Sequence, residues 1–148
     1  MTTISEQIDT TRPIETTVLE QDTPGATIVD DTYNANPIGA RAALAEAAGL
    51  AAGRDGRLVV VTPGIVELGA LQSEENERFG RRAAEVADVL IVVAKLNRDA
   101  IVAGARSVDG AEVIAVDSLD EATERLKGVL AAGDVVLFEN DLPDQYEN

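Results

Sequence analysis

From residue 26 to residue 138, short β-branched runs alternate with segments of helical period, and this alternation limits the possible folds more than any other feature. Each run is too short for a helix and is mostly apolar, which is typical of strands covered on both faces. The runs are ATIVD (26–30), LVVVT (58–62), VLIVVA (89–94), VIAV (113–116) and VVLF (135–138). We expect them to form central parallel strands.

The segments between the runs carry signals for helix ends. Asn36 is typical of an N-cap and Pro37 of a first helical position, so a helix is predicted from Pro37 to its end at Gly53. Ser118 opens an S-x-x-E capping box, and the helix after it is expected to stop at Gly133. Two further helices are predicted, one beginning near residue 73 and one over residues 97–107.

Single helices between strands favour right-handed crossovers. The predicted fold is therefore α/β, a Rossmann-like, doubly wound and mostly parallel sheet of about six strands with helices on both faces. Its first strand, ETTVLE at 15–20, is short, Thr-rich and followed by a Thr-Pro-Gly turn, so we expect an antiparallel edge strand. In such sheets ligands bind beyond the carboxyl ends of the strands.

The length of 148 residues suits one domain. Residues 1–11 are polar and without period, and we interpret them as a flexible leader or linker remnant, with the folded domain covering 12–148. The leader lacks the basic start and apolar run of a signal peptide, and no apolar stretch is long enough to span a bilayer. A cytoplasmic protein is predicted.

Composition excludes several kinds of chemistry. Twelve basic and 27 acidic residues give a net charge of -15, which disfavours nucleic acid and anionic membranes as partners. Cys and His are both absent, so a thiol nucleophile, an imidazole base and a Cys/His zinc site are excluded, and no metal site is predicted. Chemistry is left to carboxylates, amides, Lys, Arg or the backbone.

The loop DDTYNANP (30–37) brings several polar groups to a helix N-terminus. Carboxylates and amides there can hold ribose hydroxyls, a metal-bound water or an incoming amine, and the free helix N–H groups favour anions. The same residues also suit an Asx-rich turn with a helix cap, and the residues alone leave both interpretations open. The candidate binding residues of this loop are Asp30, Asp31, Tyr33, Asn34 and Asn36.

DDTYNANP followed by an Ala-rich helix resembles the opening of the C-terminal domain of UDP-N-acetylmuramoyl-tripeptide:D-alanyl-D-alanine ligases, the MurF type of Mur ligase. Related Mur and folylpolyglutamate ligases carry a similar Asp-x-x-His/Asn-x-Pro signature. Glu67, Leu68 and Gly69 are similar to a later Glu-Leu-Gly of the MurF pattern. The resemblance covers residues 12–138 and is specific in its first motif, so the chain is identified as a MurF-like domain.

The resemblance implies an ADP-forming ligase of peptidoglycan and cell-wall synthesis. In such a ligase ATP phosphorylates a substrate carboxylate, and an amino-acid or peptide-like amine then attacks the acyl phosphate. This domain would close over the site beside a central ATPase domain, with ATP and Mg bound in the complete ligase and neither held firmly by the domain alone. By position, Asp30, Asp31, Asn34 and Asn36 would face nucleotide and amine, and Arg12 would match a linker arginine that reaches ATP.

Two segments depart from the MurF pattern. TPGIV (62–66) stands where a Gly-Asp-Met-type run is expected, so Glu67 fits an exposed loop carboxylate as well as a site residue. FENDLPDQY (138–146) stands where a Lys-Gly-Ser-Arg-type segment is expected, and its Glu139, Asn140 and Asp141 fit either selection of a cationic amine or, more plainly, an acidic exposed tail.

Lys95, Asn97 and Arg98 follow the third main strand and form the one compact basic group near the expected ligand edge. A contact of Asn97 and Arg98 with phosphate or carboxylate is one interpretation. The other is that Asn97 caps a helix while the two charges are solvated.

No Gly-Lys-Ser/Thr phosphate loop occurs in the chain, so we expect the chain alone to be inactive toward ATP. The leading hypothesis is a ligase domain that needs other domains to complete its site. The alternative is a stand-alone, non-catalytic module that binds a nucleotide or a protein. A third hypothesis, an independent enzyme using Asp30 and Asp31 as acid and base, is disfavoured because adjacent strand residues point to opposite sides.

Overall fold

The computed structural model describes residues 26–31 and 36–140 and, as backbone, residues 15–19. The predicted runs and periodic segments each form an element. The elements are β1 (Glu15–Leu19), β2 (Ala26–Asp31), α2 (Pro37–Gly53), β3 (Leu58–Thr62), η1 (Gly69–Leu71), α3 (Gln72–Val86), β4 (Val89–Val93), α4 (Arg98–Arg106), β5 (Glu112–Val116), α5 (Leu119–Val129) and β6 (Val135–Glu139).

The strands form one sheet in the order β1-β2-β6-β3-β4-β5. Strands β2 to β6 are mutually parallel, and β1 runs antiparallel to β2 at the edge. The last strand in sequence therefore lies between the first two parallel strands, β2 and β3. The predicted Rossmann-like α/β architecture with a parallel sheet is confirmed.

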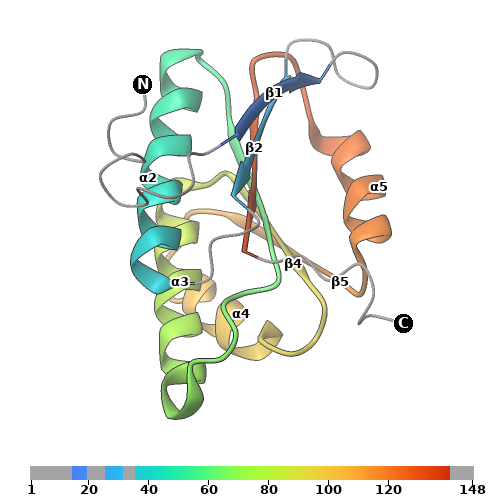
Figure 1. Cartoon of the computed structure of the whole chain (residues 1–148). Coiled ribbons are helices and arrows are strands. Elements are labelled where there is room, and N and C mark those ends of the chain that lie inside the picture. The colour runs from blue at the N-terminus through green and yellow to red at the C-terminus, as the bar shows by residue number, and fades with distance from the viewer. Residues whose placement is uncertain (1–14, 20–25, 32–35, 141–148) are drawn as a thin grey trace.

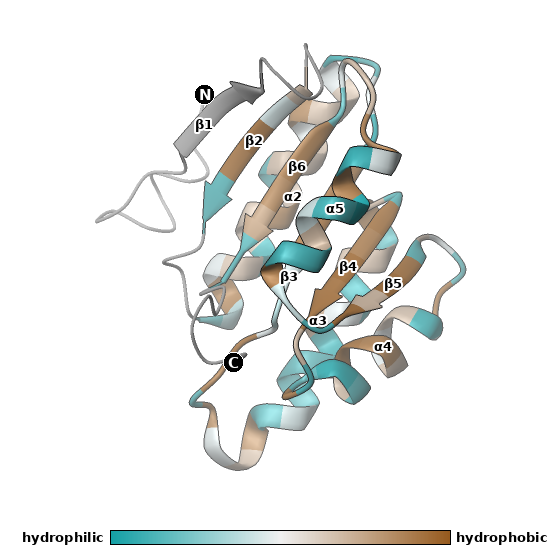
Figure 2. Cartoon of the chain, turned by 90° about the vertical axis from the view of Figure 1, so that its right-hand side faces the viewer, coloured by the Kyte–Doolittle hydropathy of each residue, from teal (hydrophilic) through white to brown (hydrophobic). Residues whose placement is uncertain are grey.

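Helices cover both faces of the sheet. Helices α2, α3 and α4 lie on one face and α5 on the other, as Figure 1 shows from the side. Alternate residues of each strand face the two layers, so Val60 and Leu137 pack under α2 and α3, whereas Val59 and Val136 pack toward α5. Figure 2 shows the apolar strands behind the more polar outer surface of α5.

Capping residues fix the helix starts as predicted. The side chain of Asn36 accepts a hydrogen bond from the backbone N–H of Gly39 at 2.7 Å, and Pro37 opens α2. Ser118 accepts from the N–H of Glu121 at the start of α5. The expected stop of this last helix at Gly133 is wrong: α5 ends at Val129, and the remaining residues form a turn that leads into β6.

Two helices on one face cross at very short range. A methyl group at Gly104 of α4 would clash with the carbonyl oxygen of Glu77 in α3, and one at Gly80 of α3 would clash with that of Ile101 in α4. Only residues without a side chain allow this approach. The pair α3 and α4 thus forms a rigid unit that supports the loops after β3 and β4.

The prediction that all five apolar runs are central strands is wrong for the run at 113–116. β5 lies at the edge of the sheet, where Ala115 is exposed and Val113 is half-buried. A short apolar run does not distinguish a central strand from an edge strand, since both bury at least one face. Within residues 26–31 and 36–140, none of the helices has the length and apolar character needed to cross a membrane.

Candidate functional site

The polar residues after the strands gather at the carboxyl edge of the sheet. Because β6 lies between β2 and β3, the ends of these three strands are neighbours, and Asp31, Thr62 and Glu139 meet there. The Thr62 hydroxyl donates a hydrogen bond to the side-chain oxygen of Asn140 at 3.0 Å and accepts one from the N–H of Gly64, also at 3.0 Å. These bonds hold the loop after β3 against the end of β6.

Asp31 and Glu139 form a buried carboxyl pair. They are register partners in the parallel pair of β2 and β6, and the two residues are 3% and 0% exposed. Burial, followed by the negative charge of Asp31, raises the pKa of Glu139 well above its usual value of 4.5, against a smaller opposing effect of a backbone hydrogen bond at Asn140. Two adjacent carboxylates in a site of low dielectric resist being ionised together.

The segment after β6 begins in a buried, unusual conformation. Asn140 is 1% exposed and has a φ of 72°, and its backbone N–H donates to the carbonyl oxygen of Asp31 at 3.3 Å. The expectation of an exposed acidic tail is therefore wrong for Glu139 and Asn140. The acidic pattern suggested solvent, but β6 is inserted between two strands, and its end is covered together with theirs.

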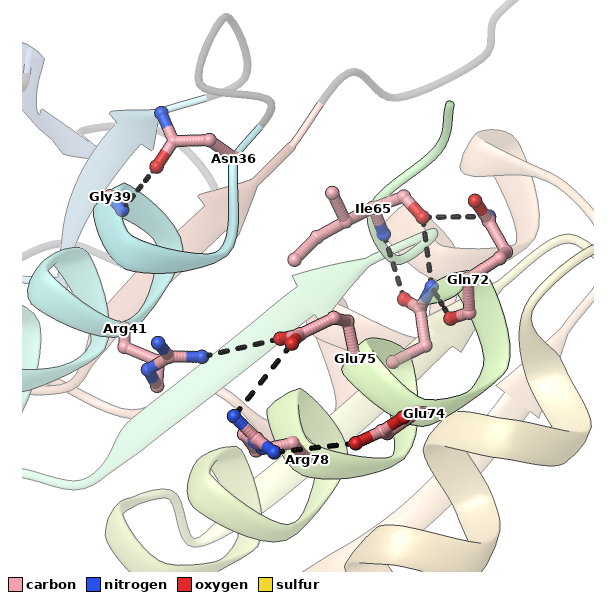
Figure 3. Close-up of polar contacts among 9 residues, drawn as sticks. Asn36, Gly39, Arg41, Ile65, Gln72, Glu74, Glu75 and Arg78 are labelled. Carbon is pink, nitrogen blue, oxygen red and sulfur yellow. Dashed lines mark hydrogen bonds and ion pairs between the residues drawn. The ribbon is translucent and has the colours of Figure 1, made fainter. Parts of the chain in front are cut away.

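A network of side-chain amides holds the loop between β3 and α3. Asn76, which is fully buried, accepts from the N–H of Ile65 and donates to the carbonyl oxygen of the same residue, both at 2.8 Å. Gln72 also donates to the Ile65 carbonyl at 2.7 Å (Figure 3). The side-chain oxygen of Gln72 accepts from the N–H of Leu68 at 3.0 Å. The loop backbone is thereby fixed by side chains instead of by strand or helix bonds.

Glu67 lies in this fixed loop. Its backbone has a φ of 65°, a conformation that non-glycine residues seldom adopt, and Glu67 is exposed to solvent. The carboxylate is thus presented to solvent from a rigid backbone. This placement agrees with the loop carboxylate expected from the sequence and leaves a binding role for Glu67 as a prediction.

Side chains of the group after β4 bind the loop after β3 and the end of β5, and their contact with a phosphate or carboxylate stays a prediction. Asn97 is the N-cap residue of α4, but its side chain makes no cap; it donates to the Pro63 carbonyl at 3.1 Å and accepts from Gln72 at 2.7 Å. Arg98 donates to the Val116 carbonyl at 2.6 Å and pairs with Asp117 at 3.0 Å. The capping interpretation is wrong for the Asn97 side chain, and the Arg98 guanidinium joins α4 to the end of β5.

The first loop is described only at its two ends. Asp30 is half-buried and pairs in register with Phe138 on the α5 side, so it and Asp31 lie on opposite faces of the sheet. Asn36 is exposed and caps α2. The structure thus does not bring Asp30 and Asp31 together as an acid and base pair. The candidates Arg12, Tyr33, Asn34 and Asp141 lie outside the described residues.

Three residues of this edge were missed in the sequence: Thr62, Gln72 and Asn76. Thr62 ends an apolar strand, and the two amides stand at the start of a polar helix where charged and polar residues are common. A possible signal was that Asn76 falls on the same helical face as Phe79, Gly80 and Ala83, where an apolar residue is expected.

Ion pairs below this edge link α2 to α3 and lie along α3 itself. Arg41 of α2 lies 3.6 Å from Glu75 of α3, and Arg78 lies 3.6 Å from Glu74 and 3.7 Å from Glu75 (Figure 3). Among residues 26–31 and 36–140, His, Cys, Asp and Glu side chains form no group of three that could hold a metal ion. The described carboxyl edge thus combines an amide network in the loop after β3 with one buried carboxyl pair at the ends of β2 and β6.

Comparison with known proteins identifies relatives of this chain. Residues 16–139 match the family model described as Mur ligase, glutamate ligase domain. No curated protein sequence matches the chain significantly. Among solved structures, MurF ligase from Thermotoga maritima in complex with ADP is similar, with a TM-score of 0.64 and 22% identity over 95% of this chain and 28% of that one.

Two further ligase structures share the fold. MurF from Acinetobacter baumannii has a TM-score of 0.62 and 23% identity over 90% of this chain and 27% of its own. A UDP-N-acetylmuramoyl-L-alanyl-D-glutamate–2,6-diaminopimelate ligase has a TM-score of 0.58 and 16% identity over 86% of this chain and 27% of its own. The chain thus spans less than a third of the length of these ligases.

Proposed function

Because the chain belongs to the Mur ligase, glutamate ligase domain family, we propose that it serves as the C-terminal domain of a MurF-like, ATP-dependent and ADP-forming amide ligase of peptidoglycan synthesis in the cytoplasm. The family match over residues 16–139 is the observation that carries the proposal. The similarity to a MurF ligase solved with ADP supports it. The partners proposed are a central ATPase domain and an amino-acid or peptide-like amine.

The reaction proposed is the formation of an amide in two steps. A substrate carboxylate takes the γ-phosphoryl group of ATP, which releases ADP, and an amine nitrogen then attacks the acyl carbon and expels inorganic phosphate as its own proton leaves. Catalysis of such transfers depends on positioning and on stabilisation of charge. A domain with a rigid carboxyl edge is suited to positioning the amine against the acyl phosphate.

The described edge fits an amine better than it fits a triphosphate. It carries the buried pair Asp31 and Glu139, whose charge repels phosphates, while the Arg98 guanidinium is bonded to Val116 and Asp117. Phosphate loops instead hold phosphates with backbone N–H groups, a Lys and a magnesium-binding hydroxyl. We therefore assign the phosphates and Mg chiefly to the central domain of the complete ligase, with α2 and its preceding loop adding contacts to the nucleotide or amine.

Calorimetric titration of ATP with Mg into the chain tests this proposal against the alternative of a stand-alone nucleotide-binding module. We expect dissociation constants in the millimolar range and no release of ADP, because the phosphates lack their main site. The matched variants are Asp31→Ala at the carboxyl edge and Asp109→Ala, an exposed residue in the loop that precedes β5 at the opposite edge. Micromolar binding that is lost in Asp31→Ala and kept in Asp109→Ala would establish the stand-alone module instead.

A further inference from the structure

The buried carboxyl pair holds a polar atom that the proposed function does not explain. Among the described residues, Glu139 Oε1 is buried and has no hydrogen-bond partner, although the Glu139 side chain is fully buried. Its other oxygen, Oε2, lies 3.4 Å from the Asn140 amide nitrogen, a long contact. An ionised carboxylate in this position would leave a buried charge with almost no compensation, which proteins seldom tolerate.

Within the part of the chain that the structure describes, the surroundings offer Glu139 a carboxylate and no cation. β3 on one side of β6 carries no charged residue, and β2 on the other side contributes Asp31 in register. Helix α2 packs over β6 and carries Arg41, which pairs with Glu75 of α3, and Glu46. The charge that acts on Glu139 is thus the negative charge of Asp31. Such a pair is stable when it shares one proton.

We propose that Glu139 is a neutral carboxylic acid at neutral pH, that it donates a hydrogen bond to the Asp31 carboxylate, and that it thereby positions Asp31 at the end of β2. The raised pKa of Glu139 agrees with this arrangement. Protonation gives the Glu139 carboxyl a hydrogen to donate, so Oε1 no longer has to be an acceptor without a donor. The role of Asp31 toward a ligand rests on the proposed function, but the protonation of Glu139 does not.

The arrangement also explains why an acidic residue can end β6. A neutral acid adds no charge to the edge, so the pair carries one negative charge, and this charge lies on the residue that leads into the first loop. Asp31 is further held because its carbonyl oxygen accepts from the N–H of Asn140. Glu139 is a positioning residue in this account, since it acts on a ligand only through Asp31.

The direct test is the infrared or ¹³C NMR signal of the Glu139 carboxyl group at neutral pH in the full chain. We expect the signal of a protonated carboxylic acid, absent from Glu139→Gln and unchanged in the exposed control Glu124→Gln. A carboxylate signal for Glu139 at pH 7 would overturn the proposal. Because this experiment contains no ligand, a protonated Glu139 in a chain that binds no nucleotide would count against the proposed function alone.

Denaturation across pH gives an independent readout. A group whose pKa is raised by folding contributes stability below its unfolded pKa, near 4.5, and loses it as pH rises toward the folded pKa. The amide introduced by Glu139→Gln can still donate to Asp31 but does not titrate. The Glu139→Gln variant should therefore gain in unfolding midpoint over the natural chain as pH rises above 4.5, whereas Glu139→Ala should be less stable than Glu139→Gln throughout. A constant difference between the natural chain and Glu139→Gln across this range would contradict the shared proton.

Discussion

Gln72 donates a hydrogen bond from its side-chain amide to the side-chain oxygen of Asn97 at 2.7 Å, and this bond joins the start of α3 to the start of α4. Both side chains also bind the loop after β3, Gln72 through Ile65 and Asn97 through Pro63. Two helix starts and one loop are therefore held by a single amide pair at the carboxyl edge of the sheet.

Removing this amide should destabilise the domain. Asn97→Ala removes the donor that the buried Pro63 carbonyl accepts from, and it removes one of the two acceptors of the Gln72 amide, which keeps its bond to Ile65. A buried polar group left without its partner costs about 1–3 kcal/mol. We expect chemical denaturation to show a loss in that range. The neighbouring exposed Lys95→Ala should change stability by less than about 0.5 kcal/mol, and equal effects of the two changes would refute the structural role of Asn97.

Two glycine substitutions should have opposite effects on stability, one at the close crossing of α3 and α4 and one in α5. In Gly104→Ala the new methyl group meets the Glu77 carbonyl, so the helices must move apart, at a cost of about 1–3 kcal/mol or more. A methyl group added at Gly128 of α5 would meet open space, so Gly128→Ala should stabilise the domain by about 0.5–1 kcal/mol through helix propensity. Thermal unfolding of both variants would measure this difference; a tolerated Gly104→Ala would show that the crossing is looser than described.

Because of Asp134, at the opposite edge of the sheet, we expect the stability of the domain to fall at acid pH. Burial alone would raise the pKa of Asp134, but hydrogen bonds from the Arg57 side chain and from the N–H groups of Arg57 and Ala131 lower it below 3.8. A lowered pKa contributes stability above the unfolded value, and this contribution is lost as pH falls through the folded value.

Asp134→Asn should therefore be less stable than the natural chain at pH 7, and the gap should close as pH falls below about 3.8. Urea denaturation at a series of pH values measures the gap. Asp109→Asn, at an exposed position, is the control and should show no such closure. A gap that stayed constant to low pH would mean that the ion pair between Arg57 and Asp134, 2.9 Å apart, does not contribute through ionisation of Asp134.

Local signals predicted the elements well. The apolar run LVVVT became β3 with every residue buried, and Asn36 with Pro37 marked the start of α2. These signals depend on residues that lie within one turn or one strand of each other, so the sequence displays them directly. The order of elements then led to a parallel sheet with helices on both faces.

The site depends on contacts between distant residues, and the sequence could not supply them. Asp31 and Glu139 meet because β6 enters the sheet between β2 and β3, and no local pattern of β6 determines this position. Because the sequence does not show that β6 lies between two strands, the acidic FEN segment (138–140) suggested an exposed tail. Asn97 matched the local pattern of a helix cap, but its buried partner, Pro63, is 34 residues away.

A ¹⁵N NMR titration of the chain with ADP and Mg, which detects millimolar binding, shows whether nucleotide contacts the carboxyl edge of the sheet. We expect amide shifts concentrated after β2, β3 and β6, as at Gly39, Gly64 and Asn140, with no shift at Gly56 or Gly133 of the opposite edge. Shifts confined to the opposite edge, or none at the carboxyl edge at millimolar nucleotide, would contradict a ligase domain that closes this edge over its nucleotide and amine.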